Sequence, residues 1–182
     1  MDDATRSASP QESEDRVMSH TFPPYSYVPG KFPHPHSDPH GHRFGSDIDP
    51  PHSPLSFDWP TGLHFRLAVD LFNLGYYWEA HEFWEMLWHA AGRKGSEATF
   101  FKALIQLAVV GVKLREGRRD GASTHARRAV ELLSQVRHEF GIESLAGISL
   151  STLIVSTEAV CELVPTISCD DQTVQIALPI RL

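Results

Sequence analysis

Proline is confined almost entirely to one end of this chain. Eleven of the 13 prolines lie before position 61, and none lies between residues 61 and 164. Because proline fixes φ and has no backbone N–H, it interrupts helices and is excluded from central strands. The chain must therefore consist of an irregular segment, residues 1–60, followed by a segment that is free to form long regular elements.

The proline-rich end divides further by composition. Residues 1–20 are charged and rich in small side chains, which predicts disorder. Residues 21–58, here called the arm, combine proline, glycine and histidine with aromatic residues at positions 22, 25, 27, 32 and 44. Since that many aromatic residues are unusual in a disordered chain, we expect the arm to pack as extended chain along the rest of the protein.

After the arm, apolar residues recur with the period of a helix. Helices are expected at about residues 61–73, 76–91, 96–116, 120–140 and 149–164. The last of these contains enough strand-forming residues to leave a partly extended form open. The expected N-caps are Thr61, Ser96 and Asp120. Short links favour antiparallel neighbours, so the sequence predicts an all-α, compact bundle of about five antiparallel helices over residues 59–165, with a docking tail over residues 166–182.

Composition narrows the class of protein. The chain is 41% hydrophobic and 21% charged, with a formal net charge of −7, as in ordinary soluble globular proteins. It shows no signal peptide and no apolar run long enough for a membrane. Cys161 and Cys169 do not form a CxxC pair and are expected to be reduced thiols. We therefore expect a cytoplasmic protein with no membrane partner; its oligomeric state stays open, a homo-oligomer included.

Basic residues gather around the expected link between the third and fourth helices. They are Arg115, Arg118, Arg119, Arg127 and Arg128. Arginine binds phosphate well, but a solvated helix end is the commoner role of such a cluster. Few aromatic residues lie among these arginines, which argues against single-stranded nucleic acid as a partner.

The strongest candidate site lies in residues 76–88, YYWEAHEFWEMLW. His81 and Glu85 are four residues apart, so they share one face of a helix beside Trp84 and Trp88. The pattern is similar to the zinc-binding HExxH helix, with Glu85 in place of the second histidine. Imidazole and carboxylate suit zinc, manganese or iron. In that interpretation His81 and Glu85 are metal ligands, and Glu82 is the catalytic base of a hydrolase.

Two ligands on one helix do not complete a metal site. Candidates for a third partner are Gln106, His125 and the arm histidines His34, His36, His40 and His42. Three alternatives stay open for His81 and Glu85: a buried structural network completed by Gln106, a metal or small-ligand site, or a partly exposed pair without consequence.

Several spaced motifs agree in order with one known family. The run Asn73-x-Gly75-x-Tyr77-x-x-Ala80-His81-Glu82-x-x-Glu85-x-x-Trp88 and the later Leu104-Ile105-Gln106 block resemble domain-of-unknown-function family 309. The resemblance covers about residues 61–140. It implies a small all-helical domain, found chiefly in prokaryotes and plastid-bearing organisms, with no established activity. By this likeness the shared positions are Asn73, Gly75, His81, Glu82, Glu85, Trp88 and Gln106.

The sequence thus supports two hypotheses of different classes. In the first, a polar pocket of His81, Glu82 and Glu85, flanked by Asn73, Trp84, Trp88 and Gln106, holds a divalent metal for binding or hydrolysis. In the second, the chain is a non-enzymatic interaction module, and the same residues form a buried hydrogen-bond network. Whether the protein is an enzyme is left undecided by its sequence.

Overall fold

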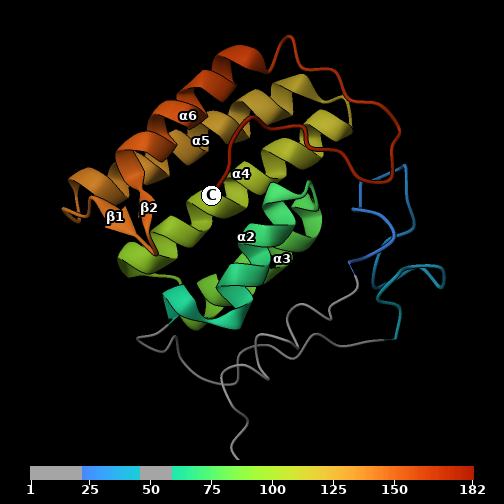
Figure 1. Cartoon of the computed structure of the whole chain (residues 1–182), viewed down its shortest axis with the longest axis horizontal. Helices are drawn as coiled ribbons and strands as arrows, with labels where there is room; N and C mark the ends of the chain where they lie inside the picture. The colour runs from blue at the N-terminus through green and yellow to red at the C-terminus, as the bar shows by residue number, and fades with distance from the viewer. Residues whose placement is uncertain (1–21, 46–58) are drawn as a thin grey trace, which may run out of the picture.

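A computed structural model describes residues 22–45 and 59–182 of the chain. Over these residues it forms one short 3-10 helix, five α-helices and one two-stranded hairpin (Figure 1). The helices are η1 (Trp59–Thr61), α2 (Leu63–Asn73), α3 (Tyr77–Ala90), α4 (Gly95–Arg115), α5 (Arg119–His138) and α6 (Leu150–Leu163). The strands are β1 (Ser144–Leu145) and β2 (Ile148–Ser149). The predicted all-α bundle of about five helices is confirmed.

Each helix packs against its neighbour in sequence, in the order α2, α3, α4, α5 and α6. Helix α4 occupies the middle of this order and contacts both α3 and α5. Its buried residues therefore surround the helix, and Phe100, Phe101, Leu104 and Leu107 have no exposed surface. A helix that is apolar on most sides is stable only in such a central place.

The three predicted N-caps, Thr61, Ser96 and Asp120, are wrong. Helix α4 begins at Gly95 and helix α5 at Arg119, so Ser96 and Asp120 lie inside the first turn instead of capping it. Helix α2 begins at Leu63, with Gly62 rather than Thr61 at the N-cap position. The N-cap positions of these three helices carry no side-chain hydrogen bond to the first turn. Packing against neighbouring helices therefore determines where these helices begin more than side-chain capping does.

Helix α6 forms fully, despite its strand-forming residues. The Ser149 side chain accepts the backbone N–H of Thr152, which satisfies one free donor of the first turn. The hairpin that precedes α6 was not predicted. Its turn is made by Ala146 and Gly147, both with positive φ, as tight hairpin turns require.

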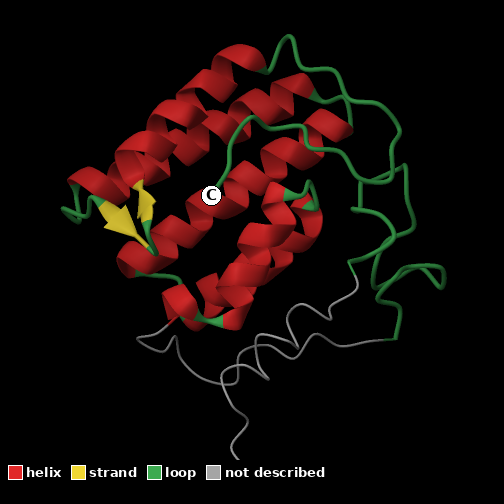
Figure 2. Cartoon of the chain, in the orientation of Figure 1, coloured by secondary structure: helices red, strands yellow, loops and turns green. Residues whose placement is uncertain are grey.

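The described part of the arm and the C-terminal tail are irregular and meet beside α3 and α4 (Figures 1 and 2). The backbone N–H of Ser26 donates to the carbonyl of Thr173 at 2.9 Å. Val28 in the arm and Leu178 in the tail are buried in the protein. The predictions for residues 1–20 and for the rest of the arm, 46–58, concern residues outside the described part.

Among the helices of residues 22–45 and 59–182, none combines the length and apolar character that a bilayer crossing needs.

Candidate functional site

His81 and Glu85 share one face of α3, as their spacing requires. His81 Nε2 lies 3.9 Å from Glu85 Oε2, which is too long for a hydrogen bond. The Glu85 side chain is 48% exposed. The His81 ring packs against Trp78 at 5.2 Å, and its Nδ1 is buried without a hydrogen-bond partner. The pair therefore lies at the edge of the protein and not in its apolar interior.

The buried carboxyl group of α3 belongs to Glu79. Its side chain is 0% exposed, and Oε1 accepts the backbone N–H of Tyr27 at 3.0 Å. Burial raises the pKa of Glu79 to about 7, although the Tyr27 hydrogen bond opposes this effect. Glu79 is not among the site residues predicted from the sequence. A signal was present, because Glu79 precedes the buried Phe83 by four residues and so shares its helix face.

The arm brings two histidines to the acidic residues of α3. His42 Nε2 lies 3.7 Å from Glu79 Oε1, and the His42 side chain is only 6% exposed. Burial, followed by the nearby charge of Arg43, lowers the pKa of His42 to about 4, so the ring is neutral at pH 7. His36 Nε2 lies 2.9 Å from Glu82 Oε1, within hydrogen-bond distance. Glu79 and Glu82 therefore both face the arm.

Gln106 and His125 form a separate polar contact between α4 and α5. Gln106 Oε1 lies 2.7 Å from His125 Nδ1. Burial lowers the pKa of His125, with the charge of Lys113 adding to the effect. Gln106, predicted to complete a network with His81 and Glu85, instead pairs with the following helix.

The two tryptophans of the predicted pocket have different surroundings. Trp84 is fully buried and packs against Phe72, with 5.5 Å between ring centres. Trp88 is partly buried, and the Arg93 guanidinium lies over its ring at 5.2 Å. Trp84 is therefore part of the core, whereas Trp88 belongs to the surface near the end of α3.

Asn73 holds the C-terminal tail and does not point at His81. Its Oδ1 accepts the backbone N–H of Leu182 at 3.0 Å, and its Nδ2 donates to the Leu182 carbonyl at 3.1 Å. The hydroxyl of Tyr77 accepts the backbone N–H groups of Ala177 and Leu178, at 2.9 and 3.0 Å. Two positions of the predicted signature thus bind tail backbone.

Gly75, between α2 and α3, also permits the close approach of the tail. Its φ is +89°, a conformation that glycine adopts without strain. A Cβ atom here would lie 2.5 Å from the carbonyl oxygen of Gln175. Both the turn and the tail contact therefore require glycine at this position.

Arg115 joins the arm to the tail. It is buried, and its guanidinium donates to the carbonyls of Ser26 at 3.3 Å, Gln172 at 2.6 Å and Thr173 at 3.3 Å. From the sequence, Arg115 was expected in a basic cluster at a solvated helix end. In the structure Arg115 is instead buried, and its guanidinium donates hydrogen bonds to carbonyl groups of both the arm and the tail.

Within residues 22–45 and 59–182, no group of three or more His, Cys, Asp or Glu side chains is arranged to hold a metal ion. Of the acidic and amide side chains of the signature, Glu82 contacts the arm and Asn73 contacts the tail, whereas Glu85 lies near His81 and Gln106 pairs with His125.

Comparison with known proteins agrees with the resemblance drawn from the sequence. Residues 65–124 match the family described as Domain of unknown function (DUF309). No curated protein and no solved structure matches the chain. The match begins within α2, spans α3 and α4, and ends in the first part of α5. This part of the chain is therefore similar to the DUF309 family, whose activity is unknown.

Proposed function

We propose that this chain is a non-enzymatic interaction module whose helical domain holds extended chain segments. The observation that supports this most strongly is the buried contact between Glu79 and the backbone of Tyr27. A carboxylate that accepts a backbone N–H recognises an extended chain largely independently of its side chains, as in other peptide-binding modules. In this protein the arm occupies that position.

The same mode of binding recurs at the tail. Asn73 makes two hydrogen bonds to the backbone of one residue, Leu182, and Tyr77 accepts two further N–H groups. Arg115 donates to carbonyls of both segments. Backbone hydrogen bonding of this kind supplies affinity, while side chains such as Val28 and Leu178 supply the apolar contact area.

A cleavage experiment tests the proposal on the full-length protein, which is cut only after it has folded. A protease site is placed within residues 46–58, and the purified protein is cut there and passed over a gel-filtration column. The released N-terminal piece should co-elute with the helical domain. In a Glu79→Ala variant it should separate, because a buried N–H of Tyr27 would lose its acceptor.

The matched control is Glu131→Ala. Glu131 is an exposed glutamate of α5 whose partner is Arg128. It should leave co-elution unchanged. Dissociation of the arm from the cut parent protein would overturn the proposal.

The second candidate function is a divalent-metal site supporting binding or hydrolysis, with His81 and Glu85 as ligands and Glu82 as base. It is favoured by one observation, the buried Nδ1 of His81 that has no hydrogen-bond partner. The chemistry of the ligands suits zinc, manganese or iron. Against it, Glu82 Oε1 already contacts His36.

Elemental analysis of the untagged protein decides between the two. A near-stoichiometric metal that is lost in both His81→Ala and Glu85→Ala, with helix content intact, would establish the metal site. Retention of metal in both variants would refute these residues as ligands.

A further inference from the structure

Residues 25–33 of the arm reverse direction around a tight turn. The backbone N–H of Lys31 donates to the carbonyl of Val28 at 3.0 Å, which closes a four-residue turn. Pro29 occupies the second position of this turn and Gly30 the third, where φ is +78°. Proline followed by a residue of positive φ is the pattern of a type II turn. Gly30 therefore has a conformation that residues with a side chain adopt only with strain.

Contacts between the two ends of this segment stabilise the reversal. The rings of Tyr25 and Phe32 stack with 5.2 Å between their centres. The Tyr25 hydroxyl donates to the carbonyl of Pro33 at 2.9 Å. Both contacts lie within residues 25–33, here called the turn motif. They hold the turn motif in its bound shape, which lowers the entropy that docking costs.

The helical domain and the tail bind the backbone of the turn motif just before the turn. Ser26 is bound through both of its peptide groups: its N–H donates to the carbonyl of Thr173 at 2.9 Å, and its carbonyl accepts from the Arg115 guanidinium at 3.3 Å. The N–H of Tyr27 donates to the Glu79 carboxyl group at 3.0 Å. Three consecutive backbone groups therefore have partners outside the arm.

The side chains at the same positions are also enclosed. Ser26 is buried, so the site accepts a small residue there. The ring of Tyr27 meets the ring of Trp78 edge-on, with 4.7 Å between ring centres. Val28 has no exposed surface. Because close packing penalises side chains of another size, these positions favour a small, an aromatic and a β-branched residue in that order.

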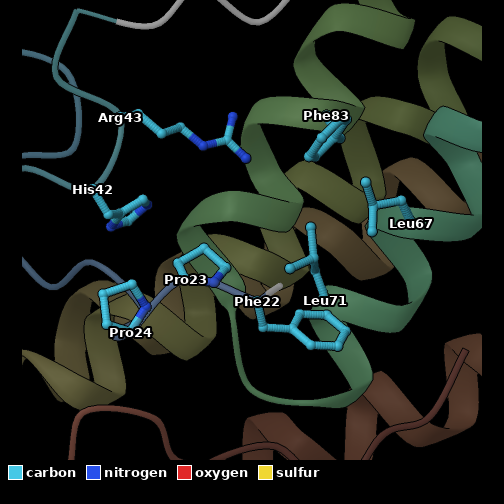
Figure 3. Close-up of a pocket in the computed structure, with 8 residues that line it drawn as sticks. All are labelled: Phe22, Pro23, Pro24, His42, Arg43, Leu67, Leu71 and Phe83. Atoms are coloured by element: carbon cyan, nitrogen blue, oxygen red, sulfur yellow. The ribbon is translucent and has the colours of Figure 1, made fainter. Parts of the chain in front are cut away.

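The arm fits the helices less closely on the N-terminal side of the turn motif. A cavity of about 310 Å³ lies there, bordered by Phe22, Pro23 and Pro24 of the arm and by residues of α2 and α3. Figure 3 shows the open space between these arm residues and Phe83 of α3. Side chains that face a void lose dispersion contacts. The selective contacts therefore belong to the turn motif.

We propose that the surface formed by α3, α4 and the tail selects this turn motif, and that its partner in trans is a second protein that presents the same motif: two stacked aromatic residues across a type II Pro-Gly turn. The inference rests on the proposed interaction module and names the segment that the module selects. The arm then acts as an internal competitor. A second copy of this chain is not the expected partner, because its own arm makes these contacts in cis at a high effective concentration.

Gly30 allows the turn to be disturbed without touching the helical domain. A Cβ atom at this position would meet no atom of the described residues within 4 Å. Valine is strained at positive φ, so Gly30→Val opposes the turn and leaves the contacts of the preceding residues unobstructed. It should weaken docking of the motif by about tenfold or more.

The assay is fluorescence anisotropy with a labelled synthetic peptide of residues 22–45 and the full-length protein. The parent peptide should bind the Gly30→Val protein saturably, and about tenfold more tightly than it binds the parent protein, because the weakened arm of the variant competes less. A Gly30→Val peptide should bind the same variant protein about tenfold more weakly than the parent peptide does.

Gly45→Val is the matched control. Gly45 also has a positive φ, +71°, and a Cβ atom there would likewise meet nothing within 4 Å among the described residues. It lies outside the turn motif, so the Gly45→Val protein should bind the peptide like the parent protein. Circular dichroism and thermal unfolding verify that both variant proteins are folded.

Three outcomes would refute the selection of the turn motif. They are no saturable binding of the parent peptide to the Gly30→Val protein at about 1 mM, equal binding of the parent and Gly30→Val peptides, and the same gain in affinity in the Gly45→Val protein. The interaction module itself is tested separately, since its failure appears as dissociation of the arm from the cut parent protein.

Discussion

Replacing Glu79 with glutamine should make the stability of the protein respond to pH in a defined way. Glutamine keeps an oxygen acceptor for the Tyr27 N–H, so the packing and this hydrogen bond are retained. What the substitution removes is the ionisable proton of a fully buried carboxyl group. The comparison of parent and variant therefore isolates the cost of charging Glu79 inside the protein.

The magnitude follows from linkage. The pKa of Glu79 is about 7 in the folded protein, against an ordinary value of 4.5. The folded state therefore holds the proton more tightly than the unfolded chain does. This contribution to stability is fully present below pH 4.5, decreases as the pH rises from 4.5, and is lost above 7. At 1.36 kcal/mol per pKa unit, the loss amounts to about 3 kcal/mol.

The assay is urea unfolding at constant ionic strength from pH 4.5 to 8, followed by tryptophan fluorescence. The free energy of unfolding of the parent minus that of Glu79→Gln should fall by about 3 kcal/mol across this range. The pKa of His42 is lowered to about 4, so its ring is neutral in the folded protein over most of this range, and His42 is present in both proteins.

A Glu131→Gln variant gives a reference substitution of the same type at an exposed position. If the Glu79→Gln difference changed by less than about 1 kcal/mol, Glu79 would titrate as an ordinary carboxyl, and the argument from burial would be refuted.

Three further substitutions test the contacts that hold the two irregular segments. Asn73→Ala should cost about 1–3 kcal/mol and speed amide hydrogen exchange at Leu182; unchanged exchange would show that the tail is held by other contacts. Gly111→Ala should cost about 1–3 kcal/mol by chemical denaturation, because a Cβ would overlap the ring of Tyr77, and a variant as stable as the parent would contradict this packing. Arg115→Met should raise hydrogen exchange in both the arm and the tail, and an effect confined to one of them would disprove the shared role.

Much of the fold followed from local patterns. The helical period of residues 61–164 predicted the number and order of the helices, because each amphipathic stripe is a property of one short segment. The helix starts at Gly95 and Arg119 were missed, since they depend on how each helix packs. The hairpin with its turn at Ala146 and Gly147 was missed because strands this short leave little signal.

The candidate site was predicted less completely. The i,i+4 spacing of His81 and Glu85 correctly predicted that their side chains are neighbours. It could not predict that Glu85 is half exposed while Glu79 is buried, because the cover over Glu79 comes from Tyr27, 52 residues earlier in the chain. Gln106 likewise found its partner, His125, on another helix.

The sequence alone determined where helices form and where they cannot, because backbone constraints such as those of proline act on the residue itself and its neighbours. Only the tertiary structure decided which carboxyl group is buried away from solvent and which polar residues bind the arm and the tail. Asn73 meets Leu182 across 109 positions of sequence. Desolvation and hydrogen bonding depend on whatever segment packs against a group, and no local pattern around Asn73 or Glu79 specifies that segment.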